Sequence, residues 1–325
     1  WPASRVPGRY EMGRRKIKAE WIVLAGIVVI LGLYLAFRTS GRLTYRLPEV
    51  AKVARETVTD IEVVKATGTV RLARQGGGWR LLPAGYPADE GKVGAVLDAV
   101  SQLAFSDLVS ESRTYSPYGL DQPGRITVRA RAGGKVVRTF EIGNAAPTYR
   151  HTYVMLPGDD RVYQAAGSFR ADFDLPPEQW QDRQVMKVAR TDISEVEIVR
   201  GTARVLWRKV AAPPVAQGGA PAAESWQLAD GKAVNAAEVD ALWNTVADLF
   251  CVRYWDGHRR EELRSPLATF TFRGTTPVTL TLFTRATADA TEYPALSSQS
   301  AFPFLLGKET AEKLLQGEAA SAVKP

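Results

Sequence analysis

Two stretches of sixteen residues decide the fold: Asp89–Ala104, DEGKVGAVLDAVSQLA, and Asn235–Phe250, NAAEVDALWNTVADLF. Asp89 and Asn235 favour the N-cap of a helix, and Asn235 is followed three residues later by Glu238, as in a capping box. Apolar residues then recur at the spacing of one helical face. The six apolar pairs, each separated by 146 residues, are Val93 and Val239, Val96 and Leu242, Leu97 and Trp243, Val100 and Val246, Leu103 and Leu249, and Ala104 and Phe250. The sequence therefore predicts two equivalent helices from a duplicated unit.

Strand patterns surround each predicted helix in the same order, first as a β-meander and then as a small antiparallel sheet. The segments before the helices are Asp60–Lys65, Thr69–Arg74 and Trp79–Leu82 in the first copy, and Glu195–Arg200, Ala203–Arg208 and Ser225–Leu228 in the second. The segments after the helices are Pro123–Arg129, Val136–Ile142 and Tyr153–Leu156, and Pro266–Arg273, Val278–Phe283 and Tyr293–Leu296. Short helices at Ala166–Asp172 and Lys308–Leu315 are expected to close the two units.

One insertion explains why the first strands of the two copies are separated by about 135 residues and the helices by 146. The inserted segment, 211–223, reads AAPPVAQGGAPAA and is expected to be a flexible surface loop by its composition. The segment 175–183, LPPEQWQDR, is expected to join the two copies.

The predicted fold class is α+β, with one N-terminal transmembrane helix followed by two tandem repeats of a small antiparallel sheet and a helix. The expected order is a basic cytoplasmic N-terminus at 1–20, a transmembrane helix at 21–37, a first repeat at 55–185, a second and diverged repeat at 190–317, and a disordered tail at 318–325.

The transmembrane prediction rests on Trp21–Phe37, WIVLAGIVVILGLYLAF, which has seventeen residues without a charge. Such a helix would be roughly 25 Å long, at the lower limit for a bilayer. Four basic residues shortly before it favour a cytoplasmic N-terminus, although three arginines on the far side weaken this asymmetry. The expected location is the bacterial inner membrane, single-pass, with the rest of the chain in the periplasm. The alternative is a cleaved signal peptide, but a small-x-small cleavage site is missing.

Charge and cysteine content exclude some classes of protein. Residues 1–52 hold ten basic and three acidic side chains, which account for the whole net charge of +7 and leave 32 of each sign in the rest. A neutral remainder argues against a nucleic-acid partner. Cys251 is the only cysteine, so an intrachain disulfide and a multi-cysteine metal site are excluded, and Cys251 is expected at the end of a buried helix.

Residues for catalysis are few. His151 and His258 lie in no recognisable ligand or triad spacing, and the chain has no G-x-S-x-G, Walker or H-E-x-x-H motif. Carboxylate pairs at Asp159 and Asp160, Asp172 and Asp174, and Asp89 and Glu90 are explained by a turn, a helix end and a helix N-terminus. The sequence therefore predicts a protein that is not an enzyme and has no cofactor, catalytic residue or metal ligand.

Several short motifs occur in a specific order: Trp79-Arg-Leu before the capped helix, Tyr118-Gly-Leu-Asp-Gln-Pro123, Phe140-Glu-Ile-Gly-Asn144, Tyr153-Val and Val162-Tyr-Gln. This order resembles the bacterial DUF4340 family over most of residues 55–185, and more weakly in the second copy. The resemblance implies a membrane-anchored protein with repeated α+β units, associated with gliding-motility-type ABC transporters. The second copy lacks the Tyr-Gly-Leu-Asp and Ile-Gly-Asn motifs.

The leading functional hypothesis is a periplasmic accessory subunit that docks on the permease and ATPase of an ABC-type transporter or on a related envelope complex, and contacts the lipid bilayer through Trp21 to Phe37. Alternatives are a lipid- or glycan-binding module with a cleft between the repeats, and a hydrolase in which Asp159, Asp172 and Asp174 converge. The candidate partner contacts are Gly32 and Ala36, a small-xxx-small pair, and the motif residues Tyr118, Gly119, Leu120 and Asp121. Gly119 and Gly143 are expected to sit in turns with positive φ.

Overall fold

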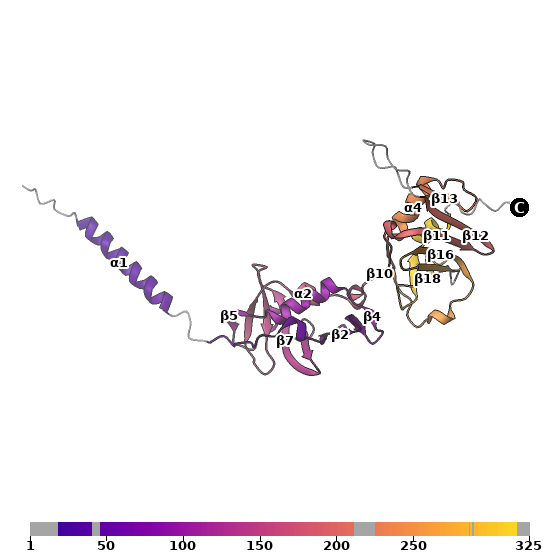
Figure 1. Ribbon diagram of the computed structural model, residues 1–325. Helices are drawn as coiled ribbons and strands as arrows, with labels where there is room; N and C mark the ends of the chain where they lie inside the picture. The colour runs from indigo at the N-terminus through magenta and orange to yellow at the C-terminus, as the bar shows by residue number, and fades with distance from the viewer. Residues whose placement is uncertain (1–18, 41–45, 211–224, 286, 288, 317–325) are drawn as a thin grey trace, which may run out of the picture.

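The computed structural model describes residues 19–40, 46–210, 225–285, 287 and 289–316. The predicted basic N-terminus up to residue 18, the loop at 211–223 and the tail at 318–325 lie outside these residues. Two large antiparallel sheets dominate the fold, and α1 lies apart from both (Figure 1). The α-helices of the described residues are α1 (Ala19–Ser40), α2 (Glu90–Ser101), α3 (Arg170–Phe173), α4 (Ala236–Val246) and α5 (Lys308–Gln316).

The first sheet, with α2 and α3, forms a unit that we call repeat one. Its nine strands are ordered β4-β3-β2-β1-β6-β7-β8-β9-β5. These strands are β1 (Asp60–Lys65), β2 (Gly68–Gln75), β3 (Gly78–Leu82), β4 (Tyr86–Pro87), β5 (Phe105–Ser110), β6 (Ile126–Ala132), β7 (Lys135–Ala145), β8 (His151–Met155) and β9 (Val162–Ala166). Two meanders, β1 to β4 and β6 to β9, therefore meet at the central pair β1 and β6.

The second sheet, with α4 and α5, forms repeat two. Its eight strands are ordered β13-β12-β11-β16-β17-β18-β19-β15. These strands are β11 (Ile193–Arg200), β12 (Ala203–Val210), β13 (Ser225–Leu228), β15 (Arg253–Tyr254), β16 (Pro266–Gly274), β17 (Val278–Phe283), β18 (Glu292–Ser297) and β19 (Phe304–Gly307). The order is that of repeat one without an equivalent of β4.

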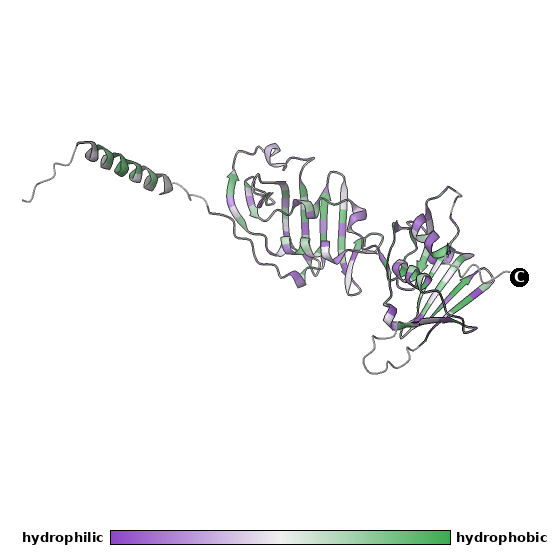
Figure 2. Ribbon diagram, turned by 90° about the horizontal axis from the view of Figure 1, so that it is seen from above, coloured by the Kyte–Doolittle hydropathy of each residue, from purple (hydrophilic) through white to green (hydrophobic). Residues whose placement is uncertain are grey.

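Strand register confirms that the two sheets are copies of one unit. Val63 pairs with Val70 in repeat one and Ile198 with Val205 in repeat two, an offset of 135 residues on both strands. Because β-strand side chains alternate between faces, a shift of one residue would have turned every apolar side chain outward. Figure 2 shows this alternation as stripes of hydrophobic and hydrophilic residues along the strands.

In each repeat, one helix covers the inner face of the sheet. The Asp89 carboxylate caps α2 by accepting from the amides of Gly91 and Lys92, and the Asn235 side chain caps α4 by accepting from the Ala237 amide. The apolar face of each helix is buried against strands β1, β2 and β6 or their equivalents. Five of the six predicted apolar pairs are buried; the sixth, Ala104 and Phe250, lies beyond the helix and is exposed in both repeats.

The predicted fold class needs correction at its N-terminus. Residues 19–40 form α1, but none of the helices in the described ranges is long and apolar enough to cross a membrane, so the prediction for Trp21–Phe37 is wrong. The uncharged stretch spans roughly 25 Å, less than the hydrocarbon core of about 30 Å. Glu20 and Arg38 limit the stretch on either side.

Smaller differences concern the ends of elements. The sheets are larger than expected, because the sequence pattern did not indicate β4, β5 and β9 in repeat one or β15 and β19 in repeat two. The first closing helix is only Arg170–Phe173, since Ala166 still belongs to β9. Cys251 does not end a helix: α4 stops at Val246, and the chain continues as the short strand β14 (Asp248–Phe250) before it.

Candidate interaction surfaces

The segment between the repeats is braced to both of them. Ala88 forms an antiparallel bridge with Gln181, and the Asp182 amide donates to the carbonyl of Pro87 at 2.9 Å. The chain then forms β10 (Gln184–Lys187), which pairs with β14 of repeat two. Backbone hydrogen bonds therefore run from the edge of the first sheet, through the connecting segment, to the second repeat.

Tyr86 at the end of the first sheet packs into the core of repeat two. Its ring stacks on Tyr254 with centroids 4.4 Å apart and meets Phe302 edge to face at 4.8 Å. Its hydroxyl donates to the carboxylate of Asp256. Burial, together with this contact, raises the pKa of Tyr86. We call Tyr86, Tyr254, Phe302 and Asp256 the aromatic joint, because these residues link the end of the first sheet to repeat two.

A buried glutamate lies on the outer face of the first sheet. Glu62 on β1 is only 6% exposed and contacts Arg71 at 3.1 Å, Arg129 at 3.2 Å and Arg131 at 3.4 Å. Burial alone would raise the pKa of Glu62, but the hydrogen bond from Arg129 and the charges of Arg131 and Arg71 outweigh it and hold the pKa below its ordinary value. The carboxylate therefore stays ionised and joins three strands.

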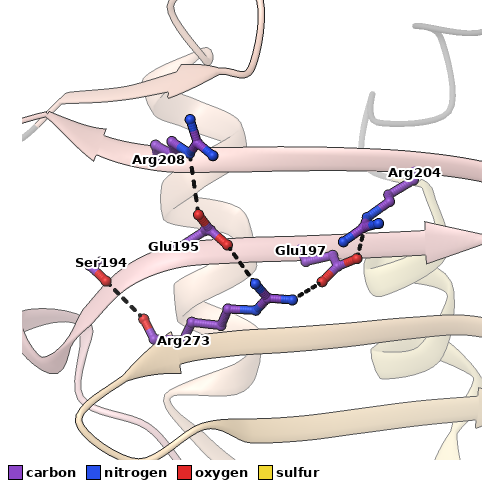
Figure 3. Close-up of polar contacts among 6 residues, drawn as sticks. All are labelled: Ser194, Glu195, Glu197, Arg204, Arg208 and Arg273. Carbon is purple, nitrogen blue, oxygen red and sulfur yellow. Dashed lines mark hydrogen bonds and ion pairs between the residues drawn. The ribbon is translucent and has the colours of Figure 1, made fainter.

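Repeat two has the same feature at the equivalent position, 135 residues later. Glu197 on β11 is 8% exposed and contacts Arg204 and, at 2.6 Å, Arg273. Glu195 on the same strand contacts Arg208 at 3.2 Å and Arg273 at 3.1 Å, so Arg273 bridges the two glutamates (Figure 3). Sequence reasoning missed both clusters, although a glutamate at the same outward position of both copies was visible in the alignment of the repeats.

The predicted contact residues in the Tyr-Gly-Leu-Asp motif lie in a loop at one end of the first sheet. Tyr118 ends the 3-10 helix η2 (Ser116–Tyr118) and packs on Tyr153 with ring centroids 5.0 Å apart. Leu120 is 1% exposed and belongs to a small core with Met155 and Val162, whereas Asp121 is partly exposed. Of these residues, Tyr118 and Asp121 present part of their side chains to solvent.

The two glycine motifs contact each other. Gly119 has φ +64°, as predicted, and a Cβ there would meet Asn144 Oδ1 at 2.4 Å. Gly143 lies within β7 without positive φ, so the predicted turn is wrong; a Cβ there would lie 2.2 Å from the Tyr118 carbonyl oxygen. Glycine is required at both positions because the loop and the strand approach closely.

The small-xxx-small pair, Gly32 and Ala36, lies within α1. A Cβ at Gly32 would meet nothing within 4 Å. The two predicted contact regions, α1 and the η2 loop, belong to different parts of the chain, and the structure does not bring them together.

The carboxylates considered for catalysis have structural partners or a buried setting. Asp159 accepts from Arg161 and, at 2.8 Å, from the Tyr163 hydroxyl, and the Arg161 contact lowers its pKa to about 2. Asp160 pairs with Arg113 at 2.5 Å, and Asp174 lies 3.5 Å from Lys65. Burial raises the pKa of Asp172.

The histidines and the cysteine also occupy structural settings. His151 begins β8, and His258 stacks on Trp255 at 3.7 Å. Cys251 is 4% exposed, and burial raises the pKa of its thiol to about 12, so it is a poor nucleophile at neutral pH. Within the described part of the chain, no group of three or more metal-ligating side chains gathers at one point.

Four pockets among the described residues are each lined by residues of one repeat and the segment beside it. The largest, of about 730 Å³, lies beside 50–56 and 101–104 in repeat one. A more apolar pocket of about 340 Å³ lies in repeat two between α4, α5 and the inner face of the sheet. Two smaller ones, of about 300 and 190 Å³, adjoin β1 and the start of β11.

The family model for "Domain of unknown function (DUF4340)" matches residues 79–266. The chain belongs to the DUF4340 family. The DUF4340 match begins in β3 of repeat one and ends in β16 of repeat two, so it includes the aromatic joint residues Tyr86, Tyr254 and Asp256. No curated protein and no solved structure matches this DUF4340 chain.

Proposed function

We propose that this DUF4340 protein is a non-enzymatic accessory subunit of the bacterial envelope that docks on the permease and ATPase of an ABC-type transporter or on a related complex. The observation that carries the proposal is the braced connection between the repeats. An adaptor that contacts one partner through two domains loses less entropy on binding when the domains are already fixed. Tyr86 and the β10–β14 pair supply that fixed geometry.

The ion-pair partners of the acidic side chains, and the burial of the only cysteine, support a binding role over a catalytic one. A general acid or base must present a free titratable group to a substrate. Glu62 and Glu197 are instead held by arginines, Asp159 by Arg161, and the Cys251 thiol is buried. The second candidate, a lipid- or glycan-binding module with a cleft between the repeats, is supported less well, since Tyr86 fills the joint.

The test is affinity purification of the tagged full-length protein from native membranes in mild detergent, with mass spectrometry of co-purifying proteins. We expect a permease and an ATPase. A chain lacking residues 1–40 tests whether the two repeats are sufficient for the contact. If the full-length protein is recovered alone under conditions that preserve other membrane complexes, the proposal is wrong.

A matched pair of variants tests the role of the braced connection. Tyr86→Ala removes the aromatic joint, and we expect it to reduce recovery of the partners while each repeat stays folded. Tyr149→Ala is the control, because Tyr149 is 78% exposed and lies in the connection between β7 and β8, whereas Tyr86 lies on β4 at the other side of the sheet. Equal recovery with both variants would contradict the need for a fixed geometry.

A further inference from the structure

The apolar pocket of repeat two has a filled counterpart in repeat one. The inner sheet face contributes Ile198, Trp207 and Phe270 to the pocket, and Leu242 of α4 and Leu314 of α5 complete its apolar lining. The offsets of 135 for β11 and β12, 142 for β16 and 146 for α4 give their equivalents in repeat one. The equivalents of the sheet and α4 residues are Val63, Leu72, Val128 and Val96, all at most 3% exposed.

In repeat one this space is filled by a tryptophan from the connecting segment. Trp180 is 0% exposed and belongs to the same core as Val63, Leu72, Val96 and Val128. Its indole Nε1 donates to the Leu175 carbonyl at 3.3 Å, which closes the segment into a compact turn through the 3-10 helix η3 (Pro177–Trp180). The inner groove of repeat one is therefore a binding site for a compact, tryptophan-bearing segment of the same chain.

Three polar contacts hold that segment. The Asp89 amide donates to the Trp180 carbonyl at 2.9 Å, the Lys92 ammonium donates to the Gln179 carbonyl, and the Lys65 ammonium donates to the Leu175 carbonyl at 2.7 Å. The residues equivalent to these donors are Asn235, Glu238 and Arg200, and all three line the pocket of repeat two. Asn235 and Arg200 keep a donor at their positions, whereas Glu238 places a carboxylate where repeat one has the Lys92 ammonium. The pocket thus corresponds to the Trp180 site in its apolar floor and at two of the three polar positions of its rim.

Repeat two supplies no such tryptophan after its last helix. Arg200 Nη2 donates to the Leu314 carbonyl at 2.7 Å, as Lys65 donates to Leu175, so the match extends to this point. The sequence that follows, GEAASAVKP at 317–325, has no aromatic residue. Within the described chain, the Asn235 amide reaches no backbone acceptor, whereas its equivalent at Asp89 does.

We infer that the pocket of repeat two binds an aromatic side chain, tryptophan best, from a short turn-forming segment of a partner protein, in the way that Trp180 fills repeat one. The polar lining consists of Arg200, Lys313 and Glu238, and Lys313 also pairs with Glu309 at 2.7 Å. The segment that fills repeat one carries an acidic residue on each side of its tryptophan, Glu178 and Asp182, so the same sequence is the natural probe for repeat two. The inference deepens the proposed docking function by naming the chemistry of one contact.

The probe is a fluorescein-labelled peptide with the sequence of residues 175–182, LPPEQWQD, added to the full-length protein and followed by fluorescence anisotropy. We expect saturable binding, and at least tenfold weaker binding for the same peptide with alanine in place of tryptophan. Absence of saturable binding with protein at about 1 mM would overturn the inference. The peptide assay contains no transporter, so its result is independent of the co-purification experiment. The proposed docking function and the proposed pocket ligand can therefore each fail without the other.

Two variants test whether the peptide occupies this pocket. Ala241→Trp and Ala237→Trp place an indole into the pocket from exposed positions on α4, and we expect at least tenfold weaker peptide binding with an unchanged melting temperature. Asn244→Trp is the control, because Asn244 is exposed on the same helix but does not line the pocket. Peptide binding that survives both pocket variants overturns the inference. The inference is also overturned if the protein binds a fatty acid in this pocket but does not bind the peptide.

Discussion

Apart from β4, repeat one and repeat two have the same strand order, and their helices are capped at equivalent positions by Asp89 and Asn235. The two repeats differ in how the groove beneath the helix is filled. Repeat one fills its groove with Trp180 from the chain that follows, while repeat two leaves a pocket of about 340 Å³. If the pocket of repeat two binds a partner as we propose, the duplication has separated two tasks: one copy fills its groove from its own chain, and the other offers it to a ligand. Differences between the copies are a guide to function that a single domain would not offer.

The largest expected effect comes from opening the groove of repeat one. Trp180→Ala removes a fully buried indole and should lower the free energy of unfolding by about 3 to 5 kcal/mol. Chemical denaturation monitored by circular dichroism measures the effect. The control is Trp255→Ala, because Trp255 is only partly buried and stacks on His258 at the surface. A loss below about 1 kcal/mol for Trp180→Ala would contradict the account of a filled groove.

Loosening the joint should make the two repeats behave as separate units. Tyr86→Ala removes the stacking on Tyr254 and Phe302 and is expected to cost about 3 kcal/mol, mostly as lost coupling. In scanning calorimetry, the Tyr86→Ala variant should show two resolved unfolding transitions, one for each repeat, where the unmodified protein shows transitions that overlap. Tyr86→Phe keeps the ring and should cost about 1 kcal/mol, through loss of the hydrogen bond to Asp256.

The glutamate clusters allow a direct comparison of the two sheets. Glu62→Gln leaves three arginines without a buried counter-charge, whereas Glu197→Gln leaves two, one of which keeps Glu195 as a partner. We expect a loss of about 2 to 3 kcal/mol for Glu62→Gln and a smaller loss, about 1 to 2 kcal/mol, for Glu197→Gln. Urea denaturation of both variants decides the order, and equal losses would show that Glu195 contributes nothing.

Acid should weaken repeat one at a turn that repeat two does not share. The Arg161 contact lowers the pKa of Asp159 to about 2, so the ionised carboxylate stabilises the fold at pH above about 4 and this stabilisation is lost as the pH falls toward 2. The contribution is on the order of 1 to 2 kcal/mol. Asp159→Asn should reduce stability at pH 7 and flatten its fall between pH 4 and 2, measured as melting temperature against pH.

The smallest effect, and one of opposite sign, is expected at Arg138. This arginine is 5% exposed, its Nη2 donates to the Ala51 carbonyl, and its Nε and Nη1 are buried without a partner. Burial lowers its pKa. At the equivalent register position repeat two has Val278. Arg138→Leu should therefore leave the stability unchanged or raise it by about 1 kcal/mol in urea denaturation, and a large loss would reveal an unrecognised partner.

Periodicity predicted the parts of the molecule that repeat locally. The pattern at Asp89–Ala104 predicted the helix cap and the buried face, because residues three and four positions apart lie on one face of a helix. The same pattern 146 residues later predicted the duplication. The short edge strand Arg253–Tyr254 was missed because two residues carry no period. The prediction that residues 21–37 cross a membrane was wrong: the seventeen uncharged residues only reach the lower limit for a bilayer, and no helix in the described part of the chain is long and apolar enough to span one.

The candidate site was harder to predict than the fold, since it depends on what is missing. Trp180 was assigned to a linker, and nothing in LPPEQWQDR indicates that its indole fills a groove formed by residues 52 to 117 positions earlier in the sequence, from Val128 to Val63. The lack of an equivalent tryptophan after Leu314 becomes informative only when the two copies are aligned through Arg200 and Lys65. The glutamates at 62 and 197 were predictable from that alignment alone.

The central pairing of each sheet also bears on how the chain folds. Within each meander of repeat one, every strand pairs with the strand next to it in the sequence. The pairing of β1 with β6 instead joins residues more than sixty positions apart, such as Val63 and Val128. Hairpins form in microseconds, whereas closure of long loops slows the assembly of sheets. The pairing of β1 with β6, like that of the edge strand β5 with β9, should therefore be a slow step of folding, and the Glu62 cluster and its Glu197 equivalent lie on the central strands that the first pairing joins.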